Sequence, residues 1–390
     1  MNFDEIIDRR GTHSVKWDMM EALYGVPAAT GLSMWVADMD FRPPACIQTA
    51  LQAMLDHGLY GYFGDDRPYK AAIGWWMDNR HGWHIQPEWI FTAHGLVNGT
   101  GLCVQTWTAP GDGVVLFTPV YHAFARVIEA AGRVVVECPL VEVDGRMTMD
   151  FTAYDSLMTG REKLLILCSP HNPGGQVWTD DELRGVADFA ERHDLVLVSD
   201  EIHHDLVMPG HAHIPMPLAA PECESRLVML TAATKTFNIA GAHTGNIIIA
   251  DPALRKQFAQ TMAGLGISAN SFGLHMVTAA YSPDGAAWVD ALCAYLDGNR
   301  QVFEAGIGAI PGLSVKPLQS TYLEWVDFAG TGMTMQEVLR RVETDAQIAA
   351  NHGTSFGTGG ESFLRFNIAT PRTRVVEAVE RLQRAFADLQ

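Results

Sequence analysis

The 390-residue sequence lacks the features that mark several classes of protein. Its six cysteines show no paired spacing, so we expect neither a disulfide framework nor a metal site. No apolar stretch is long enough to cross a bilayer. The N-terminus, Met1–Glu5, is acidic and has no apolar core, unlike a signal peptide. These absences predict a cytoplasmic protein with reduced thiols and no membrane partner.

Basic residues are also scarce. The chain has 27 lysines and arginines against 45 aspartates and glutamates, which gives a formal net charge of -18. A nucleic-acid partner is not expected, because binding phosphates requires a basic face. Hydrophobic residues make up 48% and charged residues 18% of the chain, as in a well-buried globular protein with two or three domain-sized units.

Short apolar segments alternate with helical patterns through the middle of the chain. One helix start is well marked, because Thr179 and Glu182 form the pattern of a capping box. The alternation predicts an α/β fold with a mainly parallel, seven-stranded sheet. The predicted strands are Trp89–Thr92, Val114–Phe117, Val134–Glu137, Leu164–Cys168, Leu195–Ser199, Leu227–Leu230 and Asn246–Ala250.

The C-terminal part has a different pattern. It contains a short predicted strand, Thr321–Val326, and ends in an amphipathic helix. We therefore predict a large α/β domain over residues 46–285 and a smaller α+β domain over residues 286–390. The N-terminal segment, residues 1–45, is expected to pack with the smaller domain.

Lysine is rare, and one lysine has an unusual position. Of six lysines, only Lys235 follows a predicted apolar strand and is flanked by small residues. Lys16 and Lys70 lie in polar segments that predict exposure. Asp200 likewise follows the predicted strand Leu195–Ser199. A strand-end lysine is by itself more often exposed to water. Together, however, the two residues suit a pyridoxal phosphate site, in which the lysine forms a Schiff base and the aspartate pairs with the pyridinium nitrogen.

Gly95, Tyr121 and Asn172 follow predicted strands, where ligands of open α/β sheets bind, and Arg365 lies in Phe363–Asn367, which alternates as a strand would. Gly95 precedes a helix whose free amides could bind a phosphate, although glycine is common there. Tyr121 could stack on a pyridine ring, or be a core tyrosine. Asn172 could donate to the ring hydroxyl, or cap its turn. Arg365 could bind a substrate carboxylate, or form a surface salt bridge.

In order and over nearly the whole chain, these residues resemble the fold-type I pyridoxal phosphate enzymes, the aspartate aminotransferase superfamily. Several strings further resemble its cystathionine β-lyase subgroup, typified by the MalY and PatB proteins. Those strings are Trp35–Phe41, Tyr60–Tyr62, Ser199–His203, Lys235–Asn238 and Ser320–Leu323.

The resemblance implies a role for each candidate residue. Lys235 is then the catalytic residue that binds the cofactor covalently. The implied cofactor-binding residues are Gly95, Leu96, Val97, Tyr121, Asn172, Asp200, His203, Thr234 and, from a second subunit of a homodimer, Tyr62. The implied substrate-binding residues are Val36, Ala37, Asn172 and Arg365.

The implied activity is a carbon–sulfur β-lyase that converts an amino acid thioether to pyruvate, ammonia and a thiol. One alternative is an aminotransferase, since the named residues serve both reactions; a second is a protein of this fold that acts mainly as a regulatory partner. Two positions depart from the wider superfamily. Ala232 replaces a phosphate-binding serine and His243 an arginine, so the phosphate ligands are not fixed by the resemblance.

Overall fold

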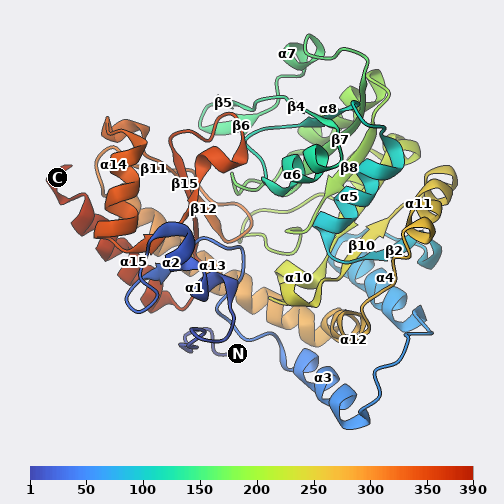
Figure 1. The fold of residues 1–390 in the computed structure, drawn as a ribbon, viewed down its shortest axis with the longest axis horizontal. Helices are drawn as coiled ribbons and strands as arrows, with labels where there is room; N and C mark the ends of the chain where they lie inside the picture. The colour runs from blue at the N-terminus through green and yellow to red at the C-terminus, as the bar shows by residue number, and fades with distance from the viewer. Residues whose placement is uncertain (390) are drawn as a thin grey trace.

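The computed structural model describes residues 1–389, and at its centre lies a seven-stranded sheet (Figure 1). The strand order is β2-β10-β9-β8-β7-β3-β4. All seven predicted strands are present, with ends shifted by two residues at most. Their bounds are β2 Ile90–Ala93, β3 Gly113–Leu116, β4 Val134–Glu137, β7 Glu162–Cys168, β8 Val196–Asp200, β9 Leu227–Thr231 and β10 Gly245–Ile248.

The sheet is mainly parallel, as predicted. Strands β4, β3, β7, β8 and β9 pair in parallel, while β10 is antiparallel to both β9 and β2. The carboxyl ends of β2, β3, β7, β8 and β9 therefore meet at one edge. In register, Cys168 at the end of β7 is opposite Asp200 at the end of β8. This pairing brings the residues that follow separate strands into one place.

Helices cover both faces of the sheet. Successive residues of a strand point to opposite faces, so they pack against different helices. Ile166 packs in one core cluster with residues of α5 (Leu96–Trp107), α6 (Ala123–Ala130) and α11 (Pro252–Gly264). Leu165 and Leu167 pack in the other cluster. That cluster includes residues of α4 (Arg67–His81), α8 (Asp180–Arg192) and α12 (Ser271–Ala280). The predicted capping box at the start of α8 is confirmed.

The C-terminal part has a four-stranded antiparallel sheet in the order β11-β12-β15-β14. The predicted strand Thr321–Val326 is β12, which begins at Leu323 because Thr321 takes a left-handed φ of 72°. The predicted final helix is α15. The elements of this part are α13 Pro283–Gly308, β11 Ser314–Val315, β12 Leu323–Asp327, α14 Met335–Leu339, β13 Ile348–Ala349, β14 Asn351–His352, β15 Phe363–Asn367 and α15 Arg372–Ala385.

The N-terminal segment lies beside this C-terminal part (Figure 1). It holds the short helices α1 (Val15–Asp18) and α2 (Met20–Tyr24), and β1 (Leu32–Ser33) pairs in parallel with β13. Helix α3 (Ala45–His57) then leads to α4. The domain boundaries at residues 45 and 285 stay predictions.

Two features differ from the sequence analysis or were missed by it. Lys16 is fully buried, so the predicted exposure of this lysine is wrong; its charged partners come from distant segments that its polar neighbours do not reveal. A hairpin of β5 (Val141–Val143) and β6 (Arg146–Thr148) was not predicted, since its strands are only three residues long. Within residues 1–389, no helix has the length and apolar character needed to cross a membrane.

Candidate active site

A cavity of about 890 Å³ opens at the edge of the sheet where the carboxyl ends of the strands meet. Residues that the sequence analysis selected from separate strands share its wall. Ten of the thirteen predicted site residues line it, and the exceptions are Val36, Tyr62 and Arg365. The ten are Ala37, Gly95, Leu96, Val97, Tyr121, Asn172, Asp200, His203, Thr234 and Lys235.

Lys235 lies in α10 (Ala233–Thr236), one turn of helix that begins directly after β9. Its amine Nζ donates to the carbonyl oxygen of Ala37 at 2.5 Å. Burial lowers the pKa of the Lys235 amine to about 8, against the opposing effect of the Asp38 charge. A substantial fraction of the amine is therefore neutral near pH 8, as a nucleophile must be.

Asp200 ends β8 and is only 4% exposed. Its Oδ1 accepts from the backbone N–H of Ile202 at 3.1 Å. No cation lies within ion-pair distance of this carboxylate among residues 1–389. Burial, with a contribution from the Glu201 charge, raises the pKa of Asp200 to about 7. A buried carboxylate of this kind is stabilised by a cationic group placed in the cavity.

The N-terminus of α5 forms another part of the wall. Its N-cap is Gly95 with φ 85°, and no side chain from the described part of the chain caps the helix. Leu96 and Val97, the first two helical residues, line the cavity together with Thr234. Free amides and the helix dipole make such an end a binding site for an anion.

Of the two departures from the wider superfamily, one lines the cavity and the other is buried. His243 lines the cavity, and its imidazole stands where the resemblance leads one to expect an arginine. Ala232 is buried, and its methyl group offers no hydrogen bond. Of these two positions, only His243 could contribute a side-chain donor to a phosphate.

Arg365, on β15, does not line the cavity but lies directly behind Asn172, which does. The guanidinium donates to Asn172 Oδ1 at 2.8 Å, to the Trp35 carbonyl oxygen at 3.0 Å and to Asn351 Oδ1 at 2.5 Å. Arg365 is 2% exposed and makes no ion pair with the residues described, so it is not in a surface salt bridge. Burial lowers its pKa to about 10.

Tyr121 and His203 complete the polar wall. Tyr121 lies between β3 and α6, and burial raises the pKa of its hydroxyl. His203 is 2% exposed, and its Nδ1 has no hydrogen-bond partner within residues 1–389. Burial, followed by the charges of Lys235 and Arg365, lowers the pKa of His203 to about 3, so the imidazole is neutral.

Two predicted site residues lie elsewhere. Val36 packs with a small apolar cluster that includes Trp35, and its carbonyl oxygen accepts from Asn367 Nδ2 at 2.6 Å. Tyr62 is fully exposed, outside the cavity. Sequence reasoning missed Asn351, the acceptor for Arg365, because no local pattern connects these two residues.

A second buried polar group lies away from the cavity. The potential ligand atoms of His81, His204 and Asp205 are within 4.8 Å of one another, although the cysteine-based sequence analysis predicts no metal site. The Asp205 carboxylate already accepts from Trp76 Nε1 at 2.9 Å, His81 Nε2 at 2.8 Å and Thr236 Oγ1 at 2.8 Å. Because these donors satisfy the carboxylate within the protein, we assign no metal to it.

The cavity fits pyridoxal phosphate on three counts. It offers an amine of lowered pKa, a buried carboxylate without a cation, and an uncapped helix N-terminus. These groups match the aldehyde, the pyridinium nitrogen and the phosphate of the cofactor.

Comparison with known proteins gives the same assignment. The family model for class I and II aminotransferases matches residues 36–382. Cystathionine beta-lyase PatB of Bacillus subtilis is 38% identical, over 99% of this chain and 100% of PatB. Protein MalY of Escherichia coli is 32% identical, over 97% of each chain. Among solved structures, cystalysin of Treponema denticola, which contains pyridoxal 5'-phosphate, is 35% identical with a TM-score of 0.95, over 100% of this chain and 99% of cystalysin.

Proposed function

The chain belongs to the class I and II aminotransferase family, and we propose that it is a pyridoxal phosphate-dependent carbon–sulfur β-lyase. The substrate is an amino acid thioether of the cystathionine or cysteine S-conjugate type, and the products are pyruvate, ammonia and a thiol. The observation that carries this function is Lys235 and Asp200 facing one cavity in a chain whose full length matches cystathionine β-lyases.

Each residue has a proposed task toward the cofactor. Lys235 would bind the aldehyde carbon, the Asp200 carboxylate would keep a proton on the ring nitrogen, and the Tyr121 ring would stack on the pyridine. Asn172 and His203 would hydrogen-bond the ring oxygen. The amides of Leu96 and Val97 at the start of α5, with the Thr234 hydroxyl, hold the phosphate. When bound, pyridoxal phosphate supplies the electron sink that makes the substrate Cα–H bond acidic.

The chain's own residues then carry the proton and orient the substrate. The Lys235 amine, neutral in part because of its lowered pKa, removes the Cα proton as general base. Arg365 lies behind Asn172, and its Nε, which has no hydrogen-bond partner within residues 1–389, is the donor proposed for the substrate carboxylate. Once the Cα proton is removed, a Cα–Cβ double bond would form as the Cβ–S bond breaks, and the sulfur would leave with its electron pair and take up the proton held by Lys235. Water would then hydrolyse the remaining fragment to pyruvate and ammonia.

The rival activity is amino transfer, which requires the same residues up to loss of the Cα proton. The two reactions differ in what they consume, because a transaminase needs a keto acid to complete its cycle and a β-lyase does not. The test is release of pyruvate from L-cystathionine by purified, cofactor-loaded protein without added keto acid. Many turnovers per subunit are expected. A single turnover that resumes only when a keto acid is added would replace the lyase by the aminotransferase.

The active site of the proposed enzyme is completed by a second copy of the chain. Tyr62, the proposed phosphate ligand from the partner subunit, lies in the segment that joins α3 to α4. Leu59 and Tyr60 beside it are also exposed. Exposed apolar side chains of this number on one segment favour an interface. Six unpaired cysteines support a reducing compartment, and we place the homodimer in the cytoplasm.

A further inference from the structure

The Lys235 amine is held by a segment far from it in sequence. We call residues 36–41 the strap; of these, Ala37 lines the cavity. The Ala37 carbonyl oxygen accepts from Lys235 Nζ at 2.5 Å. Three residues beyond the lysine, Asn238 Oδ1 accepts from the Met39 N–H at 2.9 Å, and Asn238 Nδ2 donates to the Phe41 carbonyl oxygen at 2.8 Å. The strap therefore sets where the amine lies.

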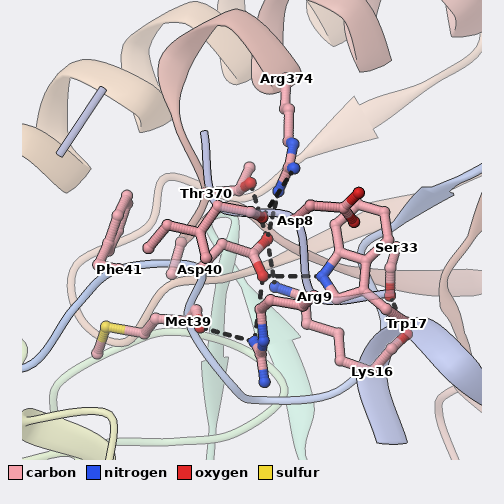
Figure 2. Close-up of polar contacts among 12 residues, drawn as sticks. Asp8, Arg9, Lys16, Trp17, Ser33, Met39, Asp40, Phe41, Thr370 and Arg374 are labelled. Atoms are coloured by element: carbon pink, nitrogen blue, oxygen red, sulfur yellow. Dashed lines mark hydrogen bonds and ion pairs between the residues drawn. The ribbon is translucent and has the colours of Figure 1, made fainter. Parts of the chain in front are cut away.

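The strap is fixed from behind by a buried charge cluster. Asp40 is 1% exposed and lies between Arg374 and Arg9, which approach it from opposite sides (Figure 2). Its Oδ1 accepts from Trp17 Nε1 at 2.9 Å and Arg9 Nη1 at 3.1 Å. Its Oδ2 accepts from Lys16 Nζ at 3.0 Å and from Arg374 Nη1 at 3.3 Å.

Arg9 and Lys16 also form hydrogen bonds with Asp38, which is closer to the Lys235 amine. Arg9 makes a two-pronged contact with the Asp38 carboxylate, at 2.9 and 2.8 Å, and donates to the Met39 carbonyl oxygen at 2.9 Å. Lys16 Nζ donates to the Asp38 carbonyl oxygen at 2.8 Å. Asp38 is thus held by its side chain and its backbone, one residue from Ala37.

We propose that Arg9 and Lys16 are positioning residues for Lys235: through Asp38 and Asp40 they hold the strap so that the Ala37 carbonyl oxygen orients the Lys235 amine, and Arg9 balances the Asp38 charge that the amine senses. The inference rests on the proposed function for the role of Lys235 itself.

Packing explains why the cluster is rigid. Lys16 is fully buried, and a buried ammonium is tolerated only when its hydrogen bonds are satisfied by an ionic partner. Burial lowers the pKa of Lys16, while the Asp40 charge opposes this. Removing one member would leave another charge buried without its partner. The strap therefore has one low-energy position, as a side chain that orients a reacting group requires.

The electrostatic part of the proposal has a defined sign. The charged or titratable groups that face Lys235 are Asp38, Asp200, Arg365 and His203. Asp38 raises the pKa of the amine, while burial lowers it to about 8. Replacing Arg9 by glutamine leaves the Asp38 charge unbalanced, so the pKa of Lys235 should rise. Replacing Asp38 by asparagine removes the raising charge, so the pKa should fall.

The experiment measures the Lys235 amine directly in the cofactor-free, full-length chain. Competitive acetylation at a series of pH values, read by mass spectrometry on the Lys235 peptide, gives the pH at which half of the amine is neutral. We expect R9Q to raise this pH and D38N to lower it, each by about half a unit or more. R9K, which keeps the charge, should lie near wild type.

The matched control is R10Q, because Arg10 is the neighbouring arginine and, among residues 1–389, its side chain contacts only exposed Asp8 and the Ala29 carbonyl oxygen. It should leave the midpoint unchanged. Opposite shifts for R9Q and D38N support the proposal, since general loosening of the fold would move both midpoints upward. Equal midpoints in all variants, or shifts of one sign, would overturn it.

The backbone part of the proposal is tested with Lys16. K16M should lose cofactor during dilution faster than wild type and should lower kcat with little change in KM. K256M is the control for loss of a lysine charge, because Lys256 of α11 has no ion pair within residues 1–389. Cofactor retention equal to wild type in a folded K16M protein would refute the positioning role. Acetylation does not require turnover, so failure of the lyase assay would leave these results interpretable.

Discussion

Asp200 gives the sharpest quantitative test of the site. Burial raises its pKa from an ordinary 3.8 to about 7, and each pKa unit corresponds to 1.36 kcal/mol, so its anion is disfavoured by about 4 kcal/mol. Two opposite unit charges about 4 Å apart attract by about 4 kcal/mol at an effective dielectric constant near 20. A protonated ring nitrogen next to Asp200 would therefore compensate for the burial of its charge.

The perturbation is D200N, which keeps the shape of the side chain and removes its charge. We expect kcat/KM for pyruvate release to fall by roughly 1000-fold, the equivalent of about 4 kcal/mol of lost stabilisation of the protonated ring. D194N is the matched control, because Asp194 precedes the same strand and its side chain is fully exposed. It should retain wild-type activity.

A cofactor analogue separates charge from geometry. Pyridoxal phosphate methylated on the ring nitrogen carries a permanent positive charge and does not need the carboxylate to hold a proton. Loading D200N with this analogue should recover a large part of the lost rate. A D200N protein with kcat/KM within tenfold of wild type, or one that the analogue does not improve, would refute the assignment of Asp200 to the ring nitrogen.

Three further predictions follow from the same geometry. R365M should lower kcat/KM for L-cystathionine by roughly 100-fold or more, because charge-assisted hydrogen bonds to the substrate are lost. It should not change the slow reaction of a thioether amine that has no carboxylate. Equal losses for both substrates would exclude carboxylate binding by Arg365. In the cofactor-free protein, Asp200 holds its proton to about pH 7, whereas the unfolded chain loses it near 3.8. As pH rises from about 4 to 7, the free energy of unfolding of the wild type should therefore fall relative to that of D200N, by up to about 4 kcal/mol. Urea unfolding measures both, and the same pH dependence in the two proteins would contradict this. Mixing inactive K235A with weakly active Y62A under subunit exchange should restore activity, because one site in a mixed dimer is then intact, and no recovery would exclude Tyr62 as a partner ligand.

Much of the fold could be predicted because it depends on local patterns. The apolar strands of the central sheet are nearly continuous runs, and the start of α8 is marked by Thr179 and Glu182, three residues apart. The residues that follow these strands share an edge whenever the strands are parallel, so Asp200 and Lys235 could be placed together from sequence. The hairpin of β5 and β6 could not be predicted, since three-residue strands carry too little pattern.

The contacts behind the site could not be predicted, because they join distant parts of the chain. Lys16 appears in a polar stretch, yet its partner Asp40 lies 24 residues away. Arg374, which meets the same carboxylate, is 334 residues from it. Asn172 and Arg365 are separated by 193 residues. Periodicity reports which face of an element is buried, but not which charges meet there.

The buried charged side chains are of two kinds: those paired with an opposite charge of the same chain and those without such a partner. Asp40 is surrounded by cations of the same chain, so its burial helps to fix one arrangement of the N-terminal segment. Asp200 and Arg365 are equally buried and have no ion-pair partner among residues 1–389. A folded protein that keeps unpaired charges in its interior loses stability unless a ligand supplies the opposite charge. The pyridinium of the cofactor and the carboxylate of an amino acid have the required signs, and for this reason we propose Asp200 and Arg365, and not the better-paired Asp40, as the residues that bind them.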